Sequence, residues 1–422
     1  MTDDFKYKKL NRYPTILGEI KPSKKGAPFS VKFDIAADVS SSFHDFSKAF
    51  YFAADIIINR MLEKCHIDEL DKYFFPVFFL YRHSIELLLK SIACIKLTDQ
   101  TDRAVFFANT FHDPESILKH ITENTTLSLP KEEMQWLQEY FHNIAKFDKA
   151  SDSFRYPYHI KAEKDIFGKQ KYTFIRVFEK QTHIDLIAEA NKMIAAYEIL
   201  ENWYDNITNT EVRVSNEYIQ CTSSFLDEGG SYYEQSVVGY EYHHNDFYAH
   251  CSGYLECGNF LQEYMISEFD SNNIPDHLFY PVCYLYRNDV ELLLKAIIFE
   301  FSGLSPQERC KILYTNKHSI LKLFCFIENN ILEQFDLSPK DNFIVNAKRY
   351  CDLLHNFDSD SSKFRYPVNK YCMPYQKTIK YYNCAELMEF LEALCNAIDG
   401  IHGEISLRSE AIAEMMAEYG QY

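Results

Sequence analysis

The sequence predicts a mostly α-helical protein: two tandem helical modules, each with a small β-hairpin, packed as a pseudo-dimer. The first observation is a repeat, because YRHSIELLLK at residues 81–90 returns as YRNDVELLLK at residues 286–295. The second is that two further segments, SILK and a loop ending in FRYP, follow each copy in the same order. The third is length, since 422 residues exceed what one hydrophobic core usually supports. A repeat this long indicates a duplicated domain and not a short-period solenoid.

The repeat and the local composition divide the chain into five parts. Residues 1–40 are a basic N-terminal arm, residues 41–207 are module one, and residues 208–241 are a linker. Residues 242–402 are module two, and residues 403–422 are a C-terminal helix. With 47% hydrophobic and 25% charged residues, the composition is typical of a globular protein and not of a disordered one.

The elements of module one can be predicted in order. Helical spacing indicates a first helix at residues 43–65, and Pro76 is expected to open the central helix, where its missing donor is harmless. Two later prolines start amphipathic helices. Residues 158–178 are expected to form an irregular hairpin, and a last helix ends the module. Module two repeats this order, with a shorter hairpin and a last helix at residues 384–401.

The central helix of each module carries a line of charged residues on an otherwise apolar surface. Arg82, Glu86 and Lys90 are spaced i, i+4 and i+8, and leucine and isoleucine cover most of the remaining circumference. A helix that is apolar nearly all round belongs in the centre of a bundle, where charges need partners. The line is either a structural ion ladder or the wall of a functional cleft. Its counterparts in module two are Arg287, Glu291 and Lys295.

The FRYP loop of each module holds an arginine between aromatic residues. Arg155 and Arg365 follow an aspartate and a serine that can hydrogen-bond the backbone where a helix ends. We expect each guanidinium to form a bidentate pair with a carboxylate of a central helix, Glu86 or Glu291. Recognition of an anion or a phosphate by the same arginines is the alternative.

Charge and cysteine content restrict the partners and the compartment. The net charge of −17 counts against broad binding to nucleic acid or an anionic membrane, but leaves room for a local basic groove. The densest basic stretch lies in the N-terminal arm. Its charges indicate either a solvated arm or a contact with nucleic acid. Twelve irregularly spaced cysteines predict free buried thiols in a reducing compartment. Because no signal peptide or long apolar run is present, we expect a cytoplasmic protein that does not enter a membrane.

Motifs for nucleotide phosphates and metals are absent from the sequence. There is no GxGxxG, no phosphate loop and no HExxH, and the Cys and His spacing is poor for zinc. We therefore expect no cofactor and no metal.

One spacing in module two is compatible with catalysis. Arg349 and His355 lie six residues apart in RYCDLLH, about 600° along a helix and 240° around its circumference. The two side chains meet only if the helix ends or bends between them. Side by side, they could cleave RNA without a metal, with the His as general acid or base and the Arg stabilising the charged phosphorane.

These features together resemble the HEPN domains (higher eukaryotes and prokaryotes nucleotide-binding). The resemblance covers both modules and rests on the aromatic-Arg pair before ELLLK, the spaced Arg and His, and the FRYP-like loop. In that family the spaced Arg and His form a metal-independent ribonuclease site, usually built across two domains, and many members serve in toxin or antiphage systems. The resemblance implies that Arg349 and His355 are the catalytic pair.

The chain departs from the family pattern in two places. Tyr350 directly follows the candidate arginine, where the family usually has a polar residue. Module one has His142-Asn143 where module two has His355-Asn356, but Trp136 stands at the position of Arg349. A two-sided site would be half empty, so module one is expected to be degenerate.

The sequence leaves two functions open. One is a HEPN-like protein acting on RNA, as a metal-independent endoribonuclease in antiphage defence or a toxin system. The other is a non-catalytic HEPN-like protein that binds, senses or serves as a scaffold. The partners to expect are RNA or a nucleotide, a partner protein of such a system, and further copies in an oligomer. The residues expected to support or bind are Arg82, Glu86, His142, Arg155, Arg287, Glu291, Asn356 and Arg365.

Overall fold

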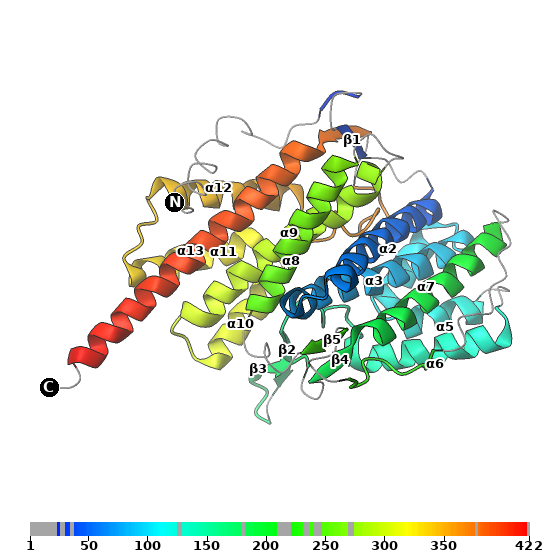
Figure 1. Cartoon of the computed structure of the whole chain (residues 1–422), viewed down its shortest axis with the longest axis horizontal. Coiled ribbons are helices and arrows are strands. Elements are labelled where there is room, and N and C mark those ends of the chain that lie inside the picture. Colours follow the sequence, from blue (N-terminus) through cyan, green and yellow to red (C-terminus); the bar gives the residue numbers. More distant parts are fainter. Residues whose placement is uncertain are drawn as a thin grey trace.

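The fold is mostly helical, as predicted, with three small two-stranded antiparallel sheets in the described part of the chain. The computed structural model describes residues 23–25, 30–33, 38–124, 129–164, 166–178, 182–208, 221–230, 236–239, 247–268, 274–375 and 379–419. Figure 1 shows the helices of module one lying beside those of module two.

The two modules have the same order of α-helices. The helices of module one are α2 (Val39–Lys64), α3 (Ile67–Lys96), α4 (Gln100–Thr110), α5 (Pro114–Asn124), α6 (Lys131–Asp148) and α7 (Leu186–Thr208). Those of module two are α8 (Tyr248–Ser267), α9 (Ile274–Phe301), α10 (Pro306–Asn316), α11 (Ile320–Asn330), the 3-10 helix η4 (Leu332–Phe335), α12 (Asn342–Phe357) and α13 (Cys384–Tyr419). The strands are β1 (Ser30–Phe33), β2 (Tyr158–Lys164), β3 (Gln170–Arg176), β4 (His183–Asp185), β5 (Val237–Gly239) and β6 (Lys380–Asn383).

Short polar side chains start several of these helices. Asp38 accepts a hydrogen bond from the Ser41 amide at the start of α2, and Asp99 accepts two at the start of α4. Ser305 and Glu308 form a reciprocal capping box at the start of α10. Such caps satisfy backbone donors that have no partner within the first helical turn.

The central helices α3 and α9 start earlier than expected. Pro76 lies inside α3, and Pro281 lies inside α9, so the prediction that Pro76 opens the central helix is wrong. A proline leaves the carbonyl four residues earlier, here that of Lys72, without its helical donor. Helix α8 approaches this carbonyl closely, because a Cβ on Gly253 would lie 2.2 Å from its oxygen. The helix continues through the proline where a second helix packs against the interruption.

Elements of the two modules pair reciprocally. Helix α2 packs on α9 of module two, and α3 packs on α8. Strand β1, in the N-terminal arm that precedes α2, pairs with β6 of module two, while β5, in the linker that precedes α8, pairs with β4 of module one. Phe79 and Tyr284 occupy the same position in the two copies (284 − 79 = 205), and their rings stack 4.6 Å apart.

Helix α13 is longer than predicted. Residues 384–401 and 403–422 were expected to form separate helices, but one helix runs from Cys384 to Tyr419. Gly403 interrupts nothing, because a helical glycine costs only about 1 kcal/mol relative to alanine. The last turns of α13 stand away from the rest of the fold (Figure 1).

The interior holds the cysteines as predicted. All twelve are free, and nine are buried. Among the described residues, the helices include none with an apolar stretch sufficient to cross a bilayer.

Candidate functional site

The charged line of α3 faces the protein interior. The side chains of Arg82 and Glu86 are fully buried, and that of Lys90 is 6% exposed. Lys90 Nζ donates to Glu86 Oε1 at 2.6 Å, and Arg82 Nη1 lies 3.9 Å from Glu86 Oε2. Arg82 Nη2 also donates to the His112 carbonyl at 2.5 Å, and its Nε lies 3.8 Å from Asp148 Oδ2. Each buried charge therefore lies beside an opposite charge, as burial requires.

Helix α9 repeats this network in module two. Lys295 Nζ donates to Glu291 Oε1 at 2.7 Å, and Arg287 Nη1 donates to Glu291 Oε2 at 3.0 Å. Arg287 Nη2 donates to the His318 carbonyl at 2.6 Å, and its Nε lies 3.7 Å from Asp358 Oδ2. The two networks use the same residue types and partners, and differ in the Arg–Glu contact, which is a hydrogen bond only in module two.

The FRYP loop of the opposite module completes each network. The Tyr366 hydroxyl of module two donates to Glu86 Oε1 at 2.9 Å, and the Tyr156 hydroxyl of module one donates to Glu291 Oε1 at 2.6 Å. In each network the ion pairs lie within one module, and the tyrosine comes from the other. Site A is Arg82, Glu86, Lys90, His112 and Tyr366; site B is Arg287, Glu291, Lys295, His318 and Tyr156.

The FRYP arginines do not form the predicted bidentate pairs. Arg155 Nη2 donates to the Tyr156 hydroxyl at 2.8 Å, its Nε donates to Asn288 Oδ1 at 3.4 Å, and Arg365 Nε donates to the Ser361 carbonyl at 2.6 Å. The loop does dock on a central helix, but through its tyrosine and on the opposite module. Each carboxylate already has a lysine and an arginine beside it, so a neutral phenol satisfies it without adding a third buried cation.

The charges of site B set the protonation of its groups. Burial by itself would raise the pKa of Glu291, but Lys295, His318 and Arg287 hold that pKa well below its usual range. Glu291 favours the charged form of His318, yet burial and the neighbouring cations Arg155 and Lys295 lower the pKa of His318 to about 4. At neutral pH, site B therefore holds an ionised carboxylate and a neutral imidazole.

A cavity of about 260 Å³ opens over site B. Tyr156, Lys295 and His318 form its inner side. Tyr314 of α10 and Lys317, the residue that follows α10, are exposed and lie at its outer side. The hairpin β2–β3 of module one supplies another wall and packs on α10. The remaining lining residues are Asp152, Tyr158, His159, Ile160, Phe174, Phe247 and Leu313.

Sites A and B differ at this outer side. The offset between their histidines (318 − 112 = 206) matches Tyr314 with Ala108 and Lys317 with Phe111. The backbones agree, since Lys317 has φ 48° and ψ −114° and Phe111 has φ 49° and ψ −111°. Beside site A, residues 368–374 with one isolated bridge take the place of the hairpin. Site B therefore has a tyrosine and a lysine where site A has an alanine and a phenylalanine.

The candidate catalytic pair lies on helix α12. This helix is unbroken from Asn342 to Phe357, so Arg349 and His355 stay about 240° apart around it. The bend that would bring them together is absent from α12. Arg349 is exposed, and His355 is half-buried with its Nδ1 lacking a hydrogen-bond partner in the described structure. The helix packs on α11 and α13 of its own module.

The corresponding region of module one has other contacts. His142 is exposed, and its Nδ1 lies 2.9 Å from Glu115 Oε1. Trp136, which stands in place of the arginine, donates its indole N–H to the Cys221 carbonyl at 2.8 Å. Asn356 of module two is exposed.

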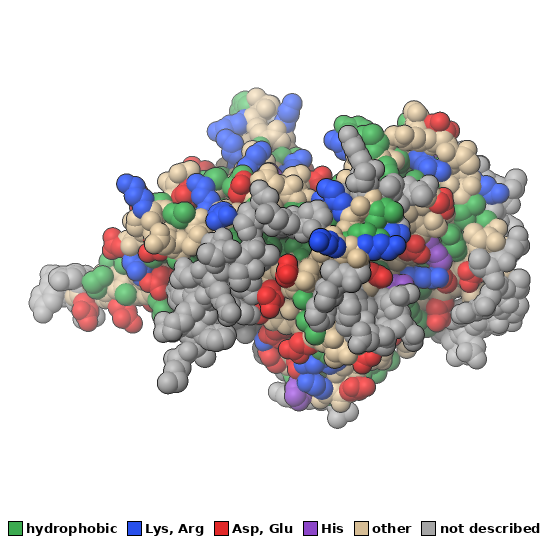
Figure 2. Space-filling view, turned by 90° about the horizontal axis from the view of Figure 1, so that it is seen from above, with side chains coloured by type: hydrophobic (Ala, Val, Ile, Leu, Met, Phe, Trp, Pro, Cys, Tyr) green, Lys and Arg blue, Asp and Glu red, His purple; other side chains and the backbone are tan. Residues whose placement is uncertain are grey.

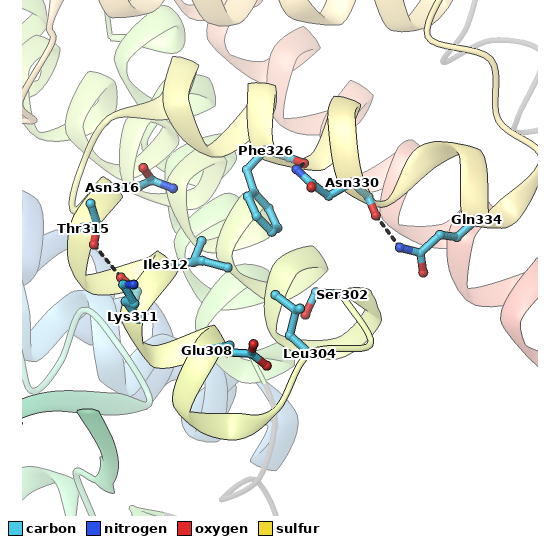
Figure 3. Close-up of a pocket in the computed structure, with 10 residues that line it drawn as sticks. All are labelled: Ser302, Leu304, Glu308, Lys311, Ile312, Thr315, Asn316, Phe326, Asn330 and Gln334. Atoms are coloured by element: carbon cyan, nitrogen blue, oxygen red, sulfur yellow. Dashed lines mark hydrogen bonds between the residues drawn. The ribbon is translucent and has the colours of Figure 1, made fainter. Parts of the chain in front are cut away.

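A second cavity, of about 550 Å³, lies among α10, α11 and η4 (Figure 3). Leu304, Ile312 and Phe326 surround it, and polar groups form its rim. Part of that rim is engaged within α10, because the Thr315 hydroxyl donates to the Lys311 carbonyl at 2.7 Å. All of its lining comes from module two.

Sequence reasoning missed the residues that build the cavity over site B. Tyr156 and His318 were not candidates, nor were Tyr314 and Lys317. A signal was present for the first two, because the tyrosine recurs in both FRYP loops and a histidine precedes SILK in both modules. No repeat could reveal the other two, since they differ between the copies.

Comparisons of the chain with protein-family models, with curated proteins and with solved structures found no match. In the part of the chain that the structure describes, no group of three or more His, Cys, Asp or Glu side chains is placed to hold a metal ion.

Proposed function

We propose that this chain is a non-catalytic HEPN-like protein, a pseudo-dimer of its two modules, that binds a nucleotide or an RNA end over site B. The proposal rests on the lining of the 260 Å³ cavity, where aromatic rings from both modules meet two lysines of module two. The pseudo-dimer is supported by the reciprocal helix contacts, the exchanged strands and the exchanged tyrosines.

The lining suits a flat aromatic base that carries an anionic group. Tyr158, Phe174 and Tyr314 offer rings against which a base can stack, a contact worth about 1–3 kcal/mol. Lys317 supplies an exposed cation for the phosphate; Lys295 also lines the cavity, with its Nζ already donating to Glu291. Such a site needs no phosphate loop, which the sequence lacks.

Overall charge favours a small ligand or a strand end over a long duplex. The chain has a net charge of −17, and neutralising many phosphates requires a broad basic surface. On the face in Figure 2, the described Lys and Arg side chains are interspersed with Asp and Glu.

The hydrogen bonds and ion pairs of Glu291 favour binding without catalysis. Glu291 is contacted by Lys295, Arg287, His318 and Tyr156, so its carboxylate is engaged and poorly suited to act as a general base. The buried ions of site B thus hold the inner wall rigid.

Titration calorimetry with the four nucleoside 5′-monophosphates and a 5′-phosphorylated tetranucleotide tests the proposal. We expect saturable binding that weakens about tenfold or more in Lys317→Phe and in Tyr314→Ala, since about 1.4 kcal/mol corresponds to tenfold. Both variants should fold, because they introduce the residues that stand at the equivalent positions beside site A. Phe111 there already adopts the backbone conformation of Lys317.

The matched control is Phe111→Lys, which adds the same cation beside site A and should leave the affinity unchanged. Absence of binding by every probe, or full affinity in Lys317→Phe, would contradict the proposal.

Ribonuclease activity through Arg349 and His355 is the competing hypothesis. It is favoured by the imidazole Nδ1 of His355, which has no partner among the described residues. It requires cleavage of total RNA in EDTA that disappears in His355→Ala while nucleotide binding over site B persists. Such a result would replace the non-catalytic proposal.

A further inference from the structure

The end of helix α13 extends beyond the body of the protein. Ile401 and Ile405 are buried, and Arg408 donates to the carbonyls of Phe335 and Asp336 at 2.9 and 3.0 Å. Residues 410–418 are exposed except for Ile412, which is half-buried. Figure 1 shows this end standing clear of the neighbouring helices.

The projecting end is amphipathic. Its acidic residues are spaced i, i+4 and i+8 and share one face, while its large apolar residues lie on the opposite face. Ile412 and Met416 follow Ile405 by 7 and 11 residues, so they continue the buried face of α13. Met415 and Met416 are nevertheless 52% and 71% exposed. The acidic residues are Glu410, Glu414 and Glu418.

This end lacks the packing that usually maintains a helix. Isolated helices shorter than about 12–15 residues are marginal in water, and most helical stability comes from covering an apolar face. An amphipathic helix of this kind is a common recognition element. We therefore expect another segment to cover the apolar face of residues 409–419.

We propose that the N-terminal arm of a second copy of this chain covers the projecting end. Charge complementarity carries the assignment, because residues 409–419 contain three Glu and no Lys or Arg. Residues 5–13, FKYKKLNRY, contain four basic residues and no acidic one, interleaved with apolar and aromatic residues. The arm can thus match both the apolar face and the acidic face beside it. Its basic residues are Lys6, Lys8, Lys9 and Arg12.

Reach favours the arm of a second copy. The Ser23 amide donates to the Tyr381 carbonyl at 2.6 Å, which fixes the base of the arm beside the start of α13. From there to Met415 (415 − 381 = 34 residues) a helix spans about 50 Å. The 15 residues from Lys8 to Ser23 cover about 50 Å only when fully extended. A second copy supplies the arm without this stretching, and two arms on two helix ends form a closed pair.

Light scattering coupled to size exclusion, over a concentration series, tests the proposal. The full chain should be a dimer. Deletion of residues 1–20, charge reversal of the four basic residues, and the double variant Met415→Glu with Met416→Glu should each give monomers. The control is Ile187→Glu, which places one glutamate at an exposed apolar position of α7 and should leave the dimer intact.

Each other outcome overturns the assignment. If the full chain is a monomer, no second copy covers the projecting end. A dimer that survives deletion of the arm but not the methionine variants shows that two α13 ends pack on each other. A dimer that survives both changes has its interface elsewhere. Circular dichroism of every variant checks that the fold is retained.

Discussion

His250 of α8 is a buried imidazole that the surrounding residues do not satisfy. It is 1% exposed, and neither ring nitrogen has a hydrogen-bond partner among the described residues. Its ring stacks on Phe75 at 3.9 Å, and burial lowers its pKa to about 3. In the reciprocal contact, Tyr280 (280 − 75 = 205) packs at 4.3 Å on Phe46, so module one uses phenylalanine at this place.

The change His250→Phe should therefore stabilise the protein. We expect the free energy of unfolding at pH 7 to rise by about 1 kcal/mol, because an unsatisfied buried polar group is removed. Unfolded His250 takes up a proton near pH 6.5, but the folded ring does so only near pH 3. Protonation of the unfolded chain therefore lowers the free energy of unfolding progressively as the pH falls below 6.5, and has no effect above it. Urea unfolding from pH 7 to pH 4 should show a shallower decline in the variant. Equal or lower stability at pH 7 would contradict this account.

At the same scale, the sequence predicts which residues are charged and buried, but not their partners. The i, i+4, i+8 spacing of Arg82, Glu86 and Lys90 correctly indicates an inward line of charge. The guanidinium of Arg155 was expected on a carboxylate, whereas the hydroxyl of Tyr156 occupies that place. Local sequence cannot decide between them, because the choice depends on how many cations already surround the carboxylate.

At the scale of elements, the contact of α8 with α3 depends on a glycine. A Cβ on Gly253 would lie 2.2 Å from the Lys72 carbonyl oxygen, which belongs to backbone and cannot move aside easily. We expect Gly253→Ala to lower the free energy of unfolding by about 2 kcal/mol, in the range of overpacked cores. Chemical denaturation measures the change.

The matched control is Gly403→Ala in α13, where nothing lies within 4 Å of the added Cβ. It should be neutral or stabilising by up to about 1 kcal/mol, from helix propensity. A Gly253→Ala variant as stable as this control would mean that α3 and α8 are not so closely packed.

Helix order could be predicted well, and pairing between modules could not. The order of most helices and the hairpin follow from spacing and prolines, but helices α4 and α10, the start of α3 and the continuity of α13 were not predicted. The exchange of β1 with β6 and of β5 with β4 has no local signal. Because the FRYP loops and central helices are nearly identical in both copies, docking within a module and between modules offers the same local chemistry.

At the scale of the whole molecule, exchange should make the two modules unfold together. Both tryptophans, Trp136 and Trp203, lie in module one, so tryptophan fluorescence reports on that module, while far-ultraviolet circular dichroism reports on both. We expect the two signals to give the same urea midpoint. A fluorescence transition displaced from the dichroism transition would show that the modules unfold independently.

The central claim is that each module completes the polar site of the other, and a set of double-mutant cycles tests it directly. Tyr156→Phe with Glu291→Gln, and Tyr366→Phe with Glu86→Gln, should each show a coupling free energy of about 1 kcal/mol or more in urea unfolding. Tyr156→Phe with Glu86→Gln, a pair within one module, should be additive within about 0.5 kcal/mol. Coupling of Tyr156 to Glu86, with none to Glu291, would contradict the account.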